Sequence, residues 1–259
     1  MKIKLFIFSL MFSFGLILSG CQSEDLTKLD EWDVVIISAS NGWGIGEQMK
    51  PMIEEELGID VNIHDFAIGS LSAVDVLAGF EGTTPNANLE KLKKIIPDAE
   101  MIVLFVDPED ITTYESSLWD QCFMGMTIEN NDGCGSDKLG NYDEVLSKIY
   151  DHIFTLKGNS PVIIRALGFY NPLISDWKKV DSVDTCNQCW LTFNEEIRKV
   201  SENYNIPFAD VWTTFNGENH LDDPRQKGYI LEDGQHCTDL GAKAQAETIL
   251  ALGYEPIKP

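Results

Sequence analysis

Short apolar runs alternate along this chain with longer segments in which apolar residues recur every three or four positions. The runs DVVIIS (33–38), MIVLFV (101–106) and PVIIRAL (161–167) are almost continuously apolar and rich in β-branched residues. That composition is typical of strands that are buried on both faces. Two further runs, VNIHDFA (61–67) and PFADVW (207–212), also predict strands.

The segments between these runs have the spacing of amphipathic helices and end at Gly or Pro. Helices are expected at 46–58, 86–97, 142–158, 190–205 and 238–253. Strands that alternate with helices imply parallel pairing with right-handed crossovers. The sequence therefore predicts an α/β fold, a flavodoxin-like three-layer α/β/α sandwich around a mostly parallel five-stranded sheet. Two segments, 112–140 and 171–188, look like irregular insertions that frame a site.

The first residues of the chain have the pattern of an export signal and predict no element of the folded domain. Two lysines precede a long uncharged run that ends in Leu18-Ser19-Gly20-Cys21. Small residues followed directly by Cys resemble a bacterial lipobox, which predicts a lipoprotein signal peptide at 1–20 and a diacylglyceryl group on Cys21; the alternative is an ordinary secretory signal. We expect residues 21–32 to form the lipidated tether and residues 33–259 one domain, anchored to a membrane of the bacterial cell envelope.

The charge balance excludes one class of partner. The chain has 42 Asp and Glu against 19 Lys and Arg, a formal net charge of −23. Binding to nucleic acid requires clustered Lys and Arg, and the sequence has no such cluster. The domain is therefore expected to be a soluble monomer that does not bind nucleic acid.

Five cysteines follow the tether: Cys122, Cys134, Cys186, Cys189 and Cys237. Export favours disulfides over free thiols. We expect Cys122 and Cys134 to close a short loop, and Cys186 or Cys189 to pair with the other or with Cys237. The odd number leaves one cysteine over. A zinc site from Cys186, Cys189, His236 and Cys237 is a weaker alternative, because adjacent His236 and Cys237 are badly placed to bind one tetrahedral ion.

Residues suited to acyl transfer follow the predicted strands. SASN (38–41) comes after the first strand, AIGS (67–70) after the second, and EDGQH (232–236) after the fifth. Ligands of open parallel sheets bind at the carboxyl ends of the strands, so these segments are expected to meet. A serine hydroxyl becomes a nucleophile when an imidazole takes its proton and a carboxylate orients that imidazole. Asp233 and His236 can supply the last two groups; His220 is the second choice as base.

The order of these blocks resembles the SGNH, or GDSL-like, hydrolase superfamily from Asp33 to Tyr254. The resemblance implies that Ser40 is the nucleophile, His236 the general base and Asp233 its orienting carboxylate. It also implies that the backbone amides of Ser40 and Gly69 stabilise the oxyanion, and that no cofactor or metal is needed. Ser38 is a rival nucleophile, since residues i and i+2 of a strand point the same way.

The third block of the superfamily pattern falls after the third predicted strand, at residues 107–110, and here the sequence departs from that pattern. Glu109 stands where the superfamily has an asparagine that donates to the oxyanion, and Ala39 stands where it has aspartate. An ionised carboxylate cannot donate, and loss of one such donor costs on the order of a hundred- to a thousandfold in turnover. Asn41 is a candidate replacement donor. Two functions follow: hydrolysis of an acyl or acetyl ester on a lipid or glycan, or binding of an envelope glycan or lipid by a domain that has lost efficient catalysis.

Overall fold

In the computed structural model, residues 26, 29–107, 122 and 136–257 are described. Within them, five strands form one sheet in the order β2-β1-β3-β4-β5, and every strand pair is parallel. This order confirms the predicted flavodoxin-like α/β fold. The order reverses between β1 and β3, which places a topological switch point, where ligands bind in such sheets, at their carboxyl ends. The strands are β1 (Glu31–Ser38), β2 (Asp60–Ala67), β3 (Met101–Leu104), β4 (Ile163–Leu167) and β5 (Phe208–Ala209).

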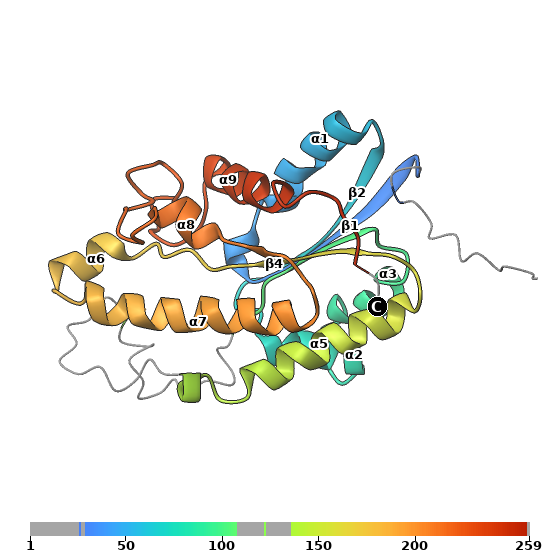
Figure 1. Cartoon of the computed structure of the whole chain (residues 1–259), viewed down its shortest axis with the longest axis horizontal. Coiled ribbons are helices and arrows are strands. Elements are labelled where there is room, and N and C mark those ends of the chain that lie inside the picture. Colours follow the sequence, from blue (N-terminus) through green and yellow to red (C-terminus); the bar gives the residue numbers. More distant parts are fainter. Residues whose placement is uncertain (1–25, 27–28, 108–121, 123–135, 258–259) are drawn as a thin grey trace, which may run out of the picture.

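Helices cover both faces of the sheet, which gives the three predicted layers (Figure 1). Helices α1 (Ile45–Leu57) and α9 (Asp239–Leu250) pack together on one face, and α2 (Ala73–Glu81), α5 (Tyr142–Lys157) and α7 (Val183–Asn203) pack on the other. The shorter helices are α3 (Leu92–Ile95), α6 (Ile174–Lys179) and α8 (Val211–Asn216). In the described part of the chain, no helix is long and apolar enough to span a bilayer.

The apolar runs of the sequence are the centre of the core. All four residues of β3 and all five of β4 are buried, because helices lie over both faces of the sheet. Arg165 is the exception to the apolar pattern: it lies within β4 and is fully buried. Its two terminal nitrogens donate to the carbonyl oxygens of Ile164 and Gly253, and the second of these bonds ties the C-terminal segment to the sheet.

The structure differs from the predicted elements in several places. Helix α2 was not predicted; it begins at Ser72, where a capping box with Asp75 satisfies the first amides. The last strand is shorter than predicted, because the Asp210 side chain accepts from the amide of Thr213 and starts α8 directly after Ala209.

The insertion at 171–188 is largely helical and not irregular as predicted. It contains α6 and the first turns of α7. Ile174, Trp177, Val180, Val183 and Cys186 recur every three positions, a helix-compatible spacing that the prediction overlooked. Trp177 and Cys186 are fully buried, so this side of the segment packs into the core.

The disulfide pairing also differs from the prediction. Cys122 is bonded to Cys186, with 5.5 Å between their Cα atoms, and therefore not to Cys134. Cys189 is disulfide-bonded too, and Cys237 is a free thiol. The pairing depends on tertiary proximity: Trp177 Nε1 donates to the Cys122 carbonyl at 2.7 Å, which holds Cys122 against α6 and beside α7. Cys21 and Cys134 lie outside the described residues.

Candidate active site

The turn that carries Ser40 follows β1 directly. Ser40 begins a short 3₁₀ helix, Ser40–Gly42, and is partly exposed. Ser38 is fully buried, and its hydroxyl donates to Asn41 Oδ1 at 3.2 Å. A Cβ atom on Gly42 would lie 2.2 Å from Ser38 Oγ, so only glycine permits this close return of the chain. Of the two serines, Ser40 is therefore the one that a substrate can reach.

Asn41 lies beneath the turn. It is 6% exposed, and its Nδ2 atom is buried without a hydrogen-bond partner among the described residues. An oxyanion donor must face the substrate, and in this arrangement the Asn41 side chain faces the interior. The backbone carbonyl oxygen of Asn41 accepts from Gln245 Nε2 of α9 at 2.9 Å, and the same nitrogen lies 3.1 Å from Cys237 Sγ. Gln245 thus links the Ser40 turn to the segment that carries His236.

Asp233 and His236 form a hydrogen-bonded pair, as the sequence predicts. His236 Nδ1 lies 2.8 Å from Asp233 Oδ2, and Asp233 Oδ1 accepts from the amides of Gln235 and His236 at 2.9 and 3.0 Å. The hydrogen bond from the Gln235 amide, followed by that from the His236 side chain, lowers the pKa of Asp233 to about 2. Asp233 is therefore an ionised acceptor that fixes the orientation of the imidazole near neutral pH.

Trp43 brings three of the predicted blocks together. Its indole ring is stacked on the ring of His236, with 4.6 Å between centroids and 18° between planes. The indole nitrogen donates to the carbonyl of Ala67 at the end of β2 at 3.0 Å, and a Cβ on Gly69 would lie 3.6 Å from the indole ring. Since Trp43 is three residues from Ser40, the Ser40 turn, the Gly69 turn and His236 lie next to one another. No hydrogen bond joins Ser40 to His236 directly, which is common before a substrate binds.

The second and third blocks lie at the same edge of the sheet. Gly69 is exposed, and its amide donates to no described residue, as an oxyanion donor requires. Asp107, after β3, forms a bridge to Ser72, and its carbonyl accepts from the amide of Ala73 at 2.8 Å. Glu109 lies outside the described residues, so its position relative to Ser40 is not part of this geometry.

The other three histidines have partners elsewhere. His64 pairs with Asp33 near the start of β1, with 2.9 Å between Nε2 and Oδ1. His152 of α5 is stacked on Phe80. His220, the second choice as base, lies against Trp212 with ring centroids 3.6 Å apart, and burial lowers the pKa of its imidazole. None of the three is bonded to Asp233.

The described residues give no support to the zinc alternative. Cys186 and Cys189 are both in disulfides, and no group of three or more His, Cys, Asp or Glu among the described residues is arranged to hold a metal ion. Cys237 is a free thiol with its pKa raised to about 11, because burial disfavours the thiolate. Near neutral pH it is therefore a neutral side chain next to the base in the chain.

Sequence reasoning missed the contacts that hold the base in place. Gln245 lies within α9, and nothing in its sequence context distinguishes it from other polar helix residues. Trp43 is 43% exposed, and its ring is stacked on that of His236, a contact between two segments that are far apart in the sequence. A large aromatic residue among the glycines of the Ser40 turn is the one signal that the sequence offers.

Comparisons with known proteins identify the fold. No protein-family model matches the sequence, and curated proteins give no match. Among solved structures, the chain is similar to the lipase Lip_vut3 from a goat rumen metagenome, at 20% identity and a TM-score of 0.62 over 86% of this chain and 98% of that one.

Two further structures agree. A DUF4886 family protein from Bacteroides uniformis is 15% identical with a TM-score of 0.56, covering 89% of this chain and 88% of that one. LAE5, an alpha/beta hydrolase enzyme from the metagenome of Lake Arreo, is 13% identical with a TM-score of 0.55, covering 85% and 94%. The chain therefore has the hydrolase fold that its resemblance to the SGNH superfamily predicts.

Proposed function

We propose that this protein is an exported, lipid-anchored serine hydrolase that cleaves an acyl or acetyl ester on a lipid or glycan. The observation that carries the proposal is the Asp233–His236 pair at the carboxyl edge of the sheet, stacked against Trp43 of the turn that bears Ser40. A carboxylate-oriented imidazole near an accessible serine is the arrangement that acyl transfer needs, and Ser40 is partly exposed. The hydrolase fold supports the proposal, although a fold by itself does not fix an activity.

The chemistry follows from which imidazole nitrogen is free. Nδ1 of His236 is engaged by Asp233, so Nε2 takes the proton as the Ser40 oxygen attacks the ester carbonyl. The amides of Ser40 and Gly69 stabilise the negative charge that develops on the carbonyl oxygen. When the ester C–O bond breaks, the imidazolium returns the proton to the leaving alcohol. Water, deprotonated by the same imidazole, then attacks the acyl-serine and releases the acid and free Ser40.

A fluorophosphonate probe and short p-nitrophenyl esters test this proposal on residues 22–259. Wild-type protein is expected to be labelled and to hydrolyse the esters, and Ser40→Ala to do neither. Ser38→Ala is the matched control, since Ser38 is fully buried and bonded to Asn41; it should retain activity. Labelling that survives Ser40→Ala, or loss of labelling in Ser38→Ala alone, would assign the nucleophile elsewhere.

A second function is motivated by Glu109 and Ala39, which depart from the superfamily pattern. A carboxylate in place of the asparagine donor would repel the developing oxyanion. The protein would then bind an envelope glycan or lipid without efficient turnover. Absence of labelling and turnover on a broad panel of acetylated glycans and acyl esters, together with measurable binding of such a glycan, would favour this function over hydrolysis.

The anchor is tested separately from the chemistry. Full-length protein produced in a bacterium is expected to partition into the detergent phase of Triton X-114 and to incorporate labelled fatty acid at Cys21. Cys21→Ser should do neither, because the thiol that carries the lipid is gone. Secretion of wild-type protein without lipid would instead indicate the ordinary secretory signal.

A further inference from the structure

The turn from Asp233 to His236 is held by side chains from outside its own segment. Its Asp233 carboxylate already accepts from two amides of the turn and from the imidazole. The two carbonyl groups between these residues are those of Gly234 and Gln235. Each of them accepts a hydrogen bond from a different distant segment, so the orientation of the turn depends on two outside contacts.

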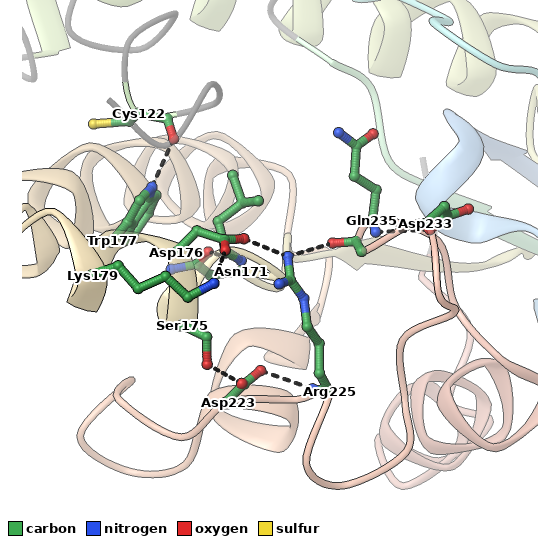
Figure 2. A network of polar contacts seen from close by, with 12 residues as sticks. Cys122, Asn171, Ser175, Asp176, Trp177, Lys179, Asp223, Arg225, Asp233 and Gln235 are labelled. Atoms are coloured by element: carbon green, nitrogen blue, oxygen red, sulfur yellow. Dashed lines mark hydrogen bonds and ion pairs between the residues drawn. The ribbon is translucent and has the colours of Figure 1, made fainter. Parts of the chain in front are cut away.

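The first contact comes from Arg225. One of its terminal nitrogens donates to the carbonyl of Gly234 at 3.0 Å. The same nitrogen donates to Asp176 Oδ2 of α6 at 2.7 Å, as Figure 2 shows. Gly234 has φ = +81°, and a Cβ there would lie 2.9 Å from the Arg225 guanidinium. The left-handed backbone of the turn therefore favours glycine, and a larger residue would also have to displace the end of the Arg225 side chain.

Arg225 is itself fixed to α6 at a second point. Its backbone amide donates to Asp223 Oδ1 at 2.9 Å, and the other oxygen of Asp223 is hydrogen-bonded to the hydroxyl of Ser175 (Figure 2). Burial raises the pKa of the Asp176 carboxyl, but the hydrogen bonds from Lys179 and Arg225 outweigh burial and leave that pKa below its ordinary value. Asp176 therefore stays ionised as the partner of Arg225.

The second contact comes from Tyr170, just after β4. Its hydroxyl donates to the carbonyl of Gln235 at 3.0 Å, and its side chain is 1% exposed. The Tyr170 ring is stacked on Phe215 with 4.5 Å between ring centroids, and the backbone carbonyl of Tyr170 accepts from Trp190 Nε1. Burial raises the pKa of Tyr170 well above its ordinary value, so the phenol remains a donor.

We propose that Arg225 and Tyr170 are positioning residues of the hydrolase: by holding the carbonyls of Gly234 and Gln235 they set the orientation of the Asp233–His236 pair toward Ser40. The proposal rests on the proposed function, because neither side chain touches Ser40. Displacement of a catalytic group by about 1 Å can lower the rate on the order of a hundredfold without affecting substrate binding.

The test compares Arg225→Gln and Tyr170→Phe with two controls that lose similar contacts away from the site. Arg198→Gln removes an arginine of α7 that pairs with Glu195 and Glu202, and Tyr150→Phe removes a buried hydroxyl bonded to Ser201. Steady-state kinetics on a p-nitrophenyl ester should give a kcat about tenfold to a hundredfold lower for both test variants, with KM changed less than about twofold. Both controls should retain wild-type kcat, although Tyr150→Phe costs stability as Tyr170→Phe does.

A proton NMR readout separates this proposal from the proposed function. The Nδ1 proton of His236 shared with Asp233 gives a low-field resonance, identified by its loss in His236→Asn. We expect that resonance to weaken or disappear in Arg225→Gln and Tyr170→Phe and to persist in the controls. If wild-type protein hydrolyses no ester but the resonance behaves in this way, the positioning role stands and the proposed function fails.

Wild-type kcat and an unchanged resonance in both test variants would overturn the proposal. If Arg225→Gln does not fold, Asp176→Asn takes its place. This substitution removes the charge of the carboxylate that pairs with Arg225, and it leaves every side chain of the turn intact. Arg225→Lys should recover only part of the lost kcat, because a single ammonium lacks the planar fork of the guanidinium. Full recovery by Lys would show that positive charge alone, and not the contact with Gly234, is what matters.

Discussion

Asn216, the last residue of α8, holds the chain segment that follows β4. It is fully buried, as is Asn171. Asn216 Oδ1 accepts from the amide of Asn171 at 2.9 Å, and Asn216 Nδ2 donates to the Asn171 carbonyl at 2.8 Å and to the Asp222 carbonyl at 3.0 Å. One side-chain amide therefore satisfies both backbone groups of Asn171, next to Tyr170. Substitution by leucine, which has nearly the same shape, removes these bonds without leaving a large cavity.

The expected cost follows from the groups left without a partner. In Asn216→Leu, the N–H and C=O of Asn171 remain buried, whereas the carbonyl of the exposed Asp222 can bond to water. Each stranded buried group costs about 1–3 kcal/mol, so the two together predict a loss of about 2–6 kcal/mol in the free energy of unfolding. That is a large part of the stability of an ordinary domain.

Guanidinium chloride unfolding, followed by circular dichroism and fluorescence, measures this loss if both probes give the same transition. The midpoint should fall with little change in the slope m. Asn203→Leu is the control: Asn203 is the last residue of α7, as Asn216 is of α8, but it is exposed. A loss below about 1 kcal/mol in Asn216→Leu, or one equal to that of Asn203→Leu, would refute the account of buried backbone groups.

Three further predictions concern single groups. The pKa of Asp233 is lowered to about 2 in the folded protein, so the ionised carboxylate stabilises the fold fully above about pH 4, and this contribution is lost as the pH falls toward about 2. The difference in unfolding free energy between wild type and Asp233→Asn should therefore shrink over that range. A difference that grows as the pH falls would contradict the lowered pKa of Asp233. Burial raises the pKa of Cys237 to about 11, so Ellman's reagent at neutral pH should react with this thiol only after unfolding. Cys237→Ser gives the background reaction. Rapid reaction of the native protein would mean that the Cys237 thiol is accessible to the reagent. Replacement of Cys122 and Cys186 by serine opens a loop with a sequence separation of 64. The gain in loop entropy of the unfolded chain should lower the free energy of unfolding by at most about 4 kcal/mol. An unchanged denaturant midpoint of unfolding would show that this disulfide does not stabilise the fold.

The strands of the sheet could be predicted because their signal is local. Val34, Ile36 and their neighbours are apolar on both sides of β1, and only a strand covered by helices on both faces needs that pattern. Helix α9 could be predicted from Thr238, whose side chain caps its first turn by accepting from the amide of Gly241. The Asp233–His236 pair could also be predicted, because both residues lie on one short turn and the carboxylate has only to fold back.

Tertiary structure decided what depends on residues distant in sequence. The bond between Cys122 and Cys186 joins an insertion to α7, whereas the sequence favoured a loop closed by Cys122 and Cys134, which are nearer in the chain. Trp177 of α6 is buried against Trp190 and bonded to the Cys122 carbonyl, contacts with residues outside α6 that the sequence of the helix does not show. Burial of Ser38 beneath its own turn likewise leaves Ser40, the residue that the resemblance implies, as the more accessible of the two serines.

The sequence by itself therefore determined the class of fold and the residue types at the strand ends. The tertiary structure decided how those residues are held. Trp43 covers His236, and Arg225 and Tyr170 hold the turn beside it, although each comes from a different segment of the chain. The physical reason is that apolar periodicity and capping act over a few residues and leave a local pattern. A hydrogen bond between distant residues leaves none, because either partner alone is an ordinary polar side chain.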